Sequence, residues 1–131
     1  MWLYEKRLQY PVNIKKADAK AAAVIIDQLG GPDGELAAAL RYLSQRYTMP
    51  YPEVQALLTD IATEELAHVE IISAIIYQLT ANLSIDEIKK QGYDKYFVTH
   101  TLGIYPQGAN NVPFTAAYFQ SKGDPITDLT E

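Results

Sequence analysis

The sequence contains no cysteine among its 131 residues. This absence excludes a disulfide framework, a thiolate zinc or iron–sulfur site and a cysteine nucleophile. A metal bound by this chain must therefore have oxygen and nitrogen ligands. The sequence also lacks a basic stripe, since 16 Asp and Glu outnumber 11 Lys and Arg and the net charge is −5. Nucleic-acid-binding proteins normally neutralise phosphates with such a stripe, so we expect no nucleic-acid partner.

Long hydrophobic runs are missing as well. Charged residues interrupt every apolar stretch before the roughly 20 residues that cross a bilayer, and we expect no membrane partner. The opening residues Met1 to Arg7 lack the basic-then-apolar order of a signal peptide. We therefore expect a cytoplasmic protein, while delivery to a coat or shell by a partner stays open. A hydrophobic content of 48% is enough for the core of one compact domain.

The sequence does contain the start signals and the apolar spacing of several helices. Asp18 is a good N-cap for an alanine-rich run that stops at Gly30, and Ser84 to Glu87 form a capping box for a short helix. Between them, two longer segments carry apolar residues at helical spacing and are separated by Pro50 and Pro52. The sequence thus predicts an all-α protein. The expected elements are an extended arm over 1–14, helices over 19–29, 33–47 and 52–79, and a short helix over 84–91.

The last third of the sequence changes in character. Residues 93–122 are rich in aromatics, Gly, Asn, Pro and Thr and predict a long wrapping loop, which is uncommon unless functional. Asp124 and Pro125 then form the start signal of another helix, with six residues following. Since one isolated turn does not repay its nucleation cost, we expect either a shortened chain or a tail completed by another subunit.

Two ionisable residues interrupt the apolar stripe of the longest predicted helix. Glu65 and His68 share this face with Leu58, Ile61 and Ile72 by three- and four-residue steps. An unpaired buried carboxylate is costly, so Glu65 needs a cation or a hydrogen-bond partner. The spacing places a carboxylate and an imidazole one turn apart, which suits a metal with mixed oxygen and nitrogen ligands. A simple buried Glu–His pair is the alternative.

The preceding helix supplies a further carboxylate. Glu35 lies seven residues before Tyr42, hence on the same face, and the alanines between them allow close approach of another helix. Antiparallel pairing could bring Glu35 opposite Glu65 and His68. A Glu on one helix and Glu-x-x-His on the next form half of the ligand set of ferritin-like di-metal bundles. Tyr42 would then orient a ligand carboxylate, or be an ordinary core tyrosine.

Longer motifs at these positions resemble the manganese catalase family, and most of all its short spore-coat members. Nearly the whole chain takes part in the resemblance, including the segment 110–125, which is similar to the loop before the family's third bundle helix. The most specific matches are the segments Met1–Val12, Gly30–Leu43 and Leu58–His68.

The resemblance implies a ferritin-like fold, with residues 1–131 as the N-terminal portion of a single domain that holds half of a four-helix di-metal bundle. It further implies that Glu35 binds one metal, Glu65 bridges both, His68 binds the other side of the pair, and Tyr42 orients a ligand. The implied reaction is the disproportionation of hydrogen peroxide to water and oxygen at two manganese ions. Iron suits the same ligands.

One departure from the family keeps other interpretations open. The third and fourth bundle helices, with the other Glu and the other His-bearing motif, do not follow Glu131. Two carboxylates and one imidazole are too few for two six-coordinate ions, so we expect a fragment or a homo-oligomer in which two copies share a site. The alternatives are a structural spore-coat protein without activity, and a homodimeric half-bundle that binds iron or manganese.

Overall fold

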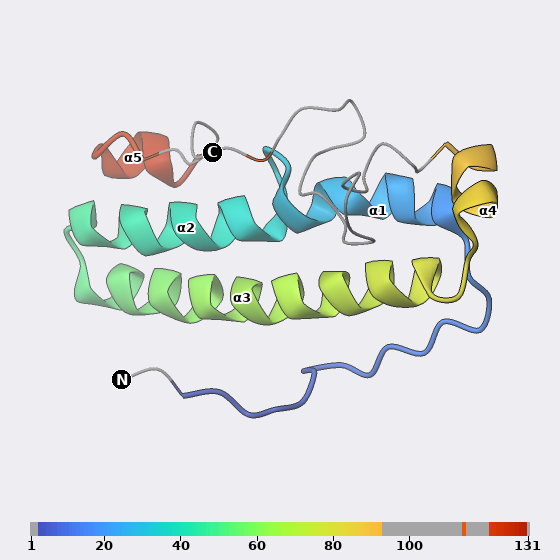
Figure 1. The fold of residues 1–131 in the computed structure, drawn as a ribbon. Coiled ribbons are helices and arrows are strands. Elements are labelled where there is room, and N and C mark those ends of the chain that lie inside the picture. Colours follow the sequence, from blue (N-terminus) through green and yellow to red (C-terminus); the bar gives the residue numbers. More distant parts are fainter. Residues whose placement is uncertain (1–2, 93–113, 115–120, 131) are drawn as a thin grey trace.

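The computed structural model describes residues 3–92, 114 and 121–130, and within these parts the chain is helical, with no strand. The loop predicted for 93–122 lies almost entirely outside the described residues. Three helices build the framework. Helix α1 (Ala19–Gly30) and helix α2 (Glu35–Gln45) follow one another along the length of α3 (Pro52–Thr80), as Figure 1 shows.

Outside α2, local signals begin the helices where the sequence predicts. The Asp18 carboxylate accepts a hydrogen bond of 3.0 Å from the backbone N–H of Ala21, and Pro52 stands in the first turn of α3. The capping box predicted at Ser84 and Glu87 is present and opens α4 (Ile85–Lys90). Each signal acts within one helical turn, which explains why it can be recognised without tertiary information.

The predicted start at Asp124 is also present and opens α5 (Pro125–Asp128). Its carboxylate accepts from the backbone N–H of Thr127 at 3.0 Å. The side chain of Asp128 is buried and accepts from the backbone N–H groups of Lys122 and Gly123 at 2.7 and 3.2 Å. These bonds to the preceding turn give the short helix support that an isolated turn lacks.

Helix α2 differs from its predicted bounds of 33–47. It begins at Glu35 instead of near Asp33, because Gly34 is extended and forms the N-cap. At the other end the regular helix stops at Gln45 and tightens into a 3-10 turn, η1 (Arg46–Thr48). A tighter last turn is common where the chain must leave a helix for a short connection.

The main core lies where α1 packs on the C-terminal half of α3 and on α4. Ala22 and Ile26 of α1 are fully buried there, at the helical spacing that the alanine-rich run predicts. The buried members of this core are Ala19, Ala22, Ile26, Ile76, Leu79 and Ile88. Phe114 packs against the same cluster.

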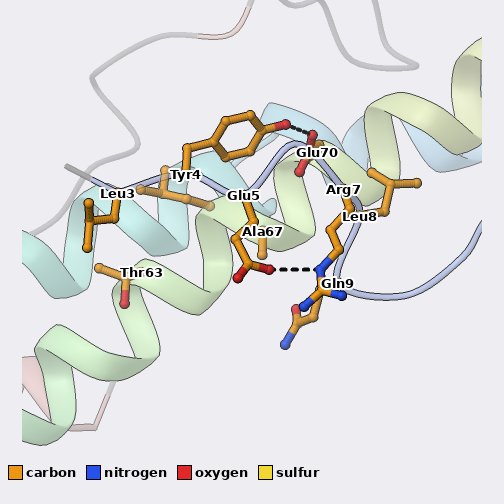
Figure 2. Close-up of a pocket in the computed structure, with 10 residues that line it drawn as sticks. Leu3, Tyr4, Glu5, Arg7, Leu8, Gln9, Thr63, Ala67 and Glu70 are labelled. Carbon is orange, nitrogen blue, oxygen red and sulfur yellow. Dashed lines mark hydrogen bonds and ion pairs between the residues drawn. The ribbon is translucent and has the colours of Figure 1, made fainter.

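The N-terminal arm runs along α3 without helical structure in its described part, as predicted. Gln78 of α3 fastens it: the side-chain carbonyl accepts from the N–H of Ile14 at 2.8 Å, and the amide donates to the carbonyl of Val12 at 3.0 Å. Towards the N-terminus, an open cleft of about 990 Å³ separates the arm from α3 (Figure 2). Tyr4 spans the cleft and donates a hydrogen bond to Glu70.

Candidate metal centre

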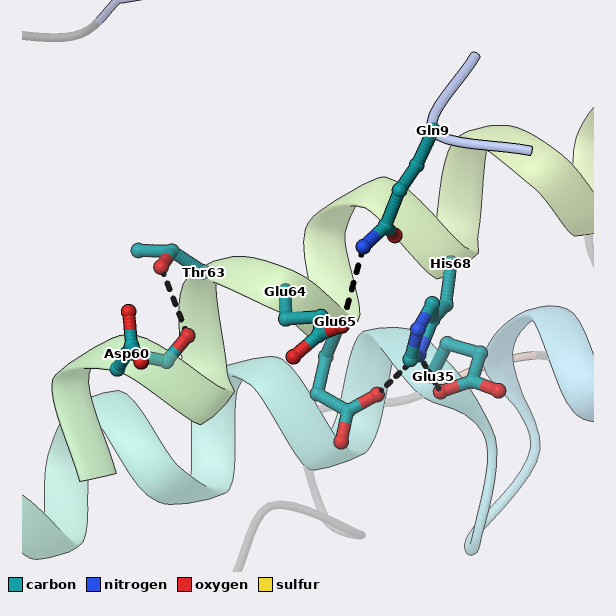
Figure 3. A network of polar contacts seen from close by, with 7 residues as sticks. All are labelled: Gln9, Glu35, Asp60, Thr63, Glu64, Glu65 and His68. Atoms are coloured by element: carbon teal, nitrogen blue, oxygen red, sulfur yellow. Dashed lines mark hydrogen bonds and ion pairs between the residues drawn. The ribbon is translucent and has the colours of Figure 1, made fainter. Parts of the chain in front are cut away.

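The antiparallel packing of α2 on α3 brings Glu35, Glu65 and His68 together (Figure 3). Nδ1 of His68 lies 2.7 Å from Oε2 of Glu65 and 3.5 Å from Oε2 of Glu35. Each residue offers one ligand atom, and these atoms all lie within 4.8 Å of one another. The prediction that antiparallel helices bring Glu35 opposite Glu65 and His68 is therefore confirmed for the positions of these side chains.

The three side chains are neither buried nor free in solvent. Their exposed fractions are 25% for Glu35, 16% for Glu65 and 34% for His68. The cluster thus lies at an open side of the helix pair. A small ligand can reach it from solvent, while the helix backbones hold the three residues in place.

Burial and charge shift two of the pKa values. Burial raises the pKa of Glu35, and the hydrogen bond and charge of Glu65 raise it further, while His68 opposes the change. Burial lowers the pKa of His68, but the hydrogen bonds and negative charges of Glu65 and Glu35 outweigh this effect and raise it overall. Two facing carboxylates therefore compete for the positive charge that a single imidazolium supplies.

The donor set fits a divalent metal ion. Oxygen and nitrogen ligands lie roughly 2.0–2.2 Å from such an ion, so two of them on one ion are at most about 4.4 Å apart. Atoms that spread over 4.8 Å need to move by only a few tenths of an ångström to share one. Two carboxylates and one imidazole suit manganese and iron alike.

The remaining predicted site residue is Tyr42. Tyr42 is half-buried, and its hydroxyl forms no hydrogen bond within the described parts of the chain. Its expected role in orienting a ligand stays a prediction. Glu64, the sequence neighbour of Glu65, is exposed and accepts a 3.0 Å hydrogen bond from Gln9 of the arm (Figure 3). His100, the other histidine of the sequence, lies outside the described residues.

Sequence reasoning missed two features of the fold. The sequence predicts only a helix stop at the turn between α1 and α2, although Gly31 and Gly34 lie so close to the Asp27 carbonyl that a side chain has no room there. The role of Gln78 in fastening the arm also carries no sequence signal, because a glutamine on a helix has many possible partners. For the turn, the spacing of three glycines within five residues just before Glu35 was the available signal.

Comparison with solved structures defines the class of protein. The chain superposes on wild-type KatB, a manganese catalase from Anabaena, with a TM-score of 0.86 and 29% sequence identity, over 99% of this chain and 58% of that one. A second structure of KatB, from Anabaena PCC7120, gives a TM-score of 0.82. The helix pair and its carboxylate–imidazole cluster thus belong to an all-α protein of ferritin-like fold.

Sequence comparison identifies the family. The profile of manganese containing catalase matches residues 1–131. Protein CotJC of Bacillus subtilis (strain 168) is 50% identical over 131 residues, which are all of this chain and 69% of that protein. A probable manganese catalase of Clostridium acetobutylicum is 33% identical over 98% of this chain and 58% of its own length. The chain belongs to the manganese containing catalase family.

The chain spans only part of these relatives. It covers 69% of CotJC but 58% of the Clostridium protein and 58% of KatB. Among the described residues, no helix is long and apolar enough to span a membrane.

Proposed function

We propose that this chain holds manganese through Glu35, Glu65 and His68 and takes part in the disproportionation of hydrogen peroxide to water and oxygen. The observation that carries the proposal is the convergence of these three side chains from two facing helices. Membership of the manganese containing catalase family supports manganese as the ion and peroxide as the substrate. Iron fits the same ligands and is the alternative metal.

The three residues would bind the metal from different sides. His68 presents Nδ1 to both carboxylates, and these three groups would hold the ion once the proton between the imidazole and Glu65 is released. Glu65 is the least exposed of the three and would hold the metal from beside His68, and its role as the bridging carboxylate is what the family resemblance implies. Glu35 approaches from α2 and closes the opposite side.

The bound manganese ions supply the two-electron redox chemistry of the reaction. The chain contributes the negative charge that holds the ions close together and the open side through which peroxide enters. The two carboxylates and one imidazole found among the described residues would leave coordination positions of a six-coordinate pair unfilled. We propose that the missing ligands come from further bundle helices of a longer chain, or from a second copy of this helix pair in a homo-oligomer. In the first case, residues 1–131 are the N-terminal portion of one domain.

A structural role in a spore coat is the second candidate. The observation that favours it is the 50% identity to CotJC, a higher identity than to the manganese catalases of Clostridium or Anabaena. In this case other coat proteins would be partners, and the protein would lie in the coat instead of the cytoplasm. The two roles differ in one measurable quantity, which is peroxide turnover.

The test combines metal content with oxygen evolution. We expect the purified chain to retain manganese and Glu65→Ala to lose it, because the variant removes the proposed bridging carboxylate. Glu64→Ala is the matched control, since Glu64 lies at the adjacent position on the same helix but bonds to the arm. It should keep the manganese of the unmodified chain.

The outcomes separate the candidates. Unchanged manganese in Glu65→Ala contradicts the ligand assignment. Oxygen release no faster than that of free manganese, from protein that retains the metal, favours the structural role. Intact mass and sedimentation of the active species show whether a longer chain or a second copy completes the site.

A further inference from the structure

The turn that connects α1 to α2 comes directly before Glu35. Gly34 is the N-cap of α2, so the position of Gly34 sets where the helix starts and where the Glu35 side chain leaves the backbone. The turn is held by short backbone bonds: Gly31 N–H donates to the Asp27 carbonyl at 2.9 Å, and Gly34 N–H donates to the Gly31 carbonyl at 3.0 Å.

Gly34 has no space for a side chain. A Cβ added there would lie 2.7 Å from the carbonyl oxygen of Asp27 and 2.9 Å from the backbone nitrogens of Gly30 and Gly31. All three contacts are shorter than real Cβ atoms accept, and all three are with backbone, which cannot rotate away. The dihedral angles of Gly34, φ −84° and ψ 166°, are open to any residue. Space, and not backbone conformation, therefore requires glycine at this position.

The α1 side of this contact is held in place. Ile26, one residue before Asp27, is fully buried in the core. Gly30 is buried and lies directly against the ring of Phe114, because a Cβ on it would come within 2.4 Å of the ring. The start of α2 is also packed, since Gly34 and Ala37 are buried, but the turn residues Pro32 and Asp33 are exposed and Glu35 is a quarter exposed. A side chain at position 34 therefore displaces Glu35 before it displaces α1.

We propose that Gly34 is a positioning residue for Glu35. The missing side chain lets α2 begin against the Asp27 carbonyl, and this close start places the Glu35 carboxylate opposite Glu65 and His68. The inference rests on the proposed metal-binding role of Glu35 for its functional meaning. Its structural part, the placement of Glu35, can be measured without any metal.

Gly34→Ala tests the proposal. Displacing a supporting contact of a ligand typically weakens metal binding about ten- to a hundredfold, and we expect a loss of that size in manganese affinity. In a crystal structure of the metal-free variant, Oε2 of Glu35 should lie about 1 Å or more farther from Nδ1 of His68 than the 3.5 Å seen here. The bond between Glu65 and His68 should remain.

Gly92→Ala is the matched control. Gly92 has a φ of 76°, so alanine strains the backbone there, but a Cβ would meet nothing within 4 Å. This variant should lose thermal stability while keeping the manganese affinity of the unmodified chain. A merely structural effect of replacing a glycine would affect both variants in the same way.

A milder variant covers the case in which Gly34→Ala does not fold. At Gly31, a Cβ would lie 2.8 Å from the same Asp27 oxygen, with the next contact at 3.5 Å. Gly31→Ala should therefore displace Glu35 less and weaken manganese binding to an intermediate degree.

Two results overturn the proposal: an unchanged distance from Glu35 to His68 in the folded variant, or equal manganese affinities of that variant and Gly92→Ala. If the unmodified chain binds no manganese, the proposed function fails, and the distance alone decides about Gly34.

Discussion

At the scale of single residues, the negative charges of Glu35 and Glu65 are only partly compensated by the other residue of the cluster, His68. Burial and the neighbouring Glu65 raise the pKa of Glu35, which means that its charged form is held at a cost. His68 supplies a single positive charge at most, and it lies between both carboxylates. The proposed divalent ion would compensate the carboxylates better. We therefore expect metal binding to stabilise the folded chain.

His68→Ala should remove the stabilisation by manganese. A ligand that binds only the folded chain raises the free energy of unfolding by about 2.7 kcal/mol at a concentration about 100 times its Kd. At the same manganese concentration, a variant with about hundredfold weaker binding should gain less than about 1 kcal/mol. Thermal unfolding with and without manganese measures the difference.

Glu70→Ala serves as control for this experiment. Glu70 lies on the same helix but accepts a hydrogen bond from Tyr4 of the arm. It should keep the full stabilisation by manganese. An equal gain for the unmodified chain and His68→Ala would show that the imidazole is not a ligand.

At the scale of elements, side-chain caps determine where three of the described helices begin. Asp18, Ser84 and Asp124 each cap a helix through a side-chain oxygen that accepts a backbone N–H. Such caps satisfy donors that have no partner inside the helix. They matter most for α4, which has six residues and one buried side chain, Ile88. The stability of α4 should therefore depend on its capping box.

The capping box makes α4 sensitive to acid. Hydrogen bonds from the side chain and backbone of Ser84 hold the pKa of Glu87 below its ordinary value of 4.5. A carboxylate whose pKa is lower in the folded state stabilises that state above the unfolded pKa, and this contribution is lost as pH falls through the folded value. Hydrogen-exchange protection of the Ile88 and Gln91 amides should thus decrease in acid below about pH 4.5.

Glu87→Gln is the matched control, because the amide oxygen still accepts the hydrogen bonds but does not titrate. Protection in this variant should not change with pH around that value after correction for intrinsic exchange. If the unmodified chain shows the same flat profile, the carboxylate does not contribute as described.

At the scale of the whole molecule, segments far apart in the sequence are joined by few polar contacts. The arm reaches α3 through Gln78, through Gln9 with Glu64, and through Tyr4 with Glu70. Gln78 is the most protected of these contacts, since its bonds to the arm backbone are partly buried. Nearer the N-terminus, the part of the arm that includes Tyr4 and Gln9 lines the open cleft together with α3.

Gln78→Ala should release the arm. The variant loses two hydrogen bonds, and at about 0.5–1.5 kcal/mol each the free energy of unfolding should fall by about 1–3 kcal/mol. Trypsin should cleave faster at the exposed Lys15 and Lys16, just after the bonded segment. Gln28→Ala, at an exposed position on α1, should change neither quantity. Equal cleavage rates in the two variants would contradict the role of Gln78.

The sequence by itself determined the features that depend on local interactions. Helix type, the caps at Asp18 and Ser84, and the shared face of Glu65 and His68 follow from spacing within a few turns, so one segment contains all the information. The antiparallel approach of Glu35 was also predictable, because a short connection between two long helices leaves little alternative. The all-α fold followed from the same patterns.

The tertiary structure decided what depends on contacts between distant segments. The start of α2 at Glu35, after a glycine that abuts the Asp27 carbonyl, is a matter of available space, which the pattern of the sequence does not contain. The same holds for the separation of Glu35 and His68 and for the fastening of the arm at Gln78. Packing selects one arrangement from several that local propensity allows, and the geometry of the candidate metal centre exists only in that arrangement.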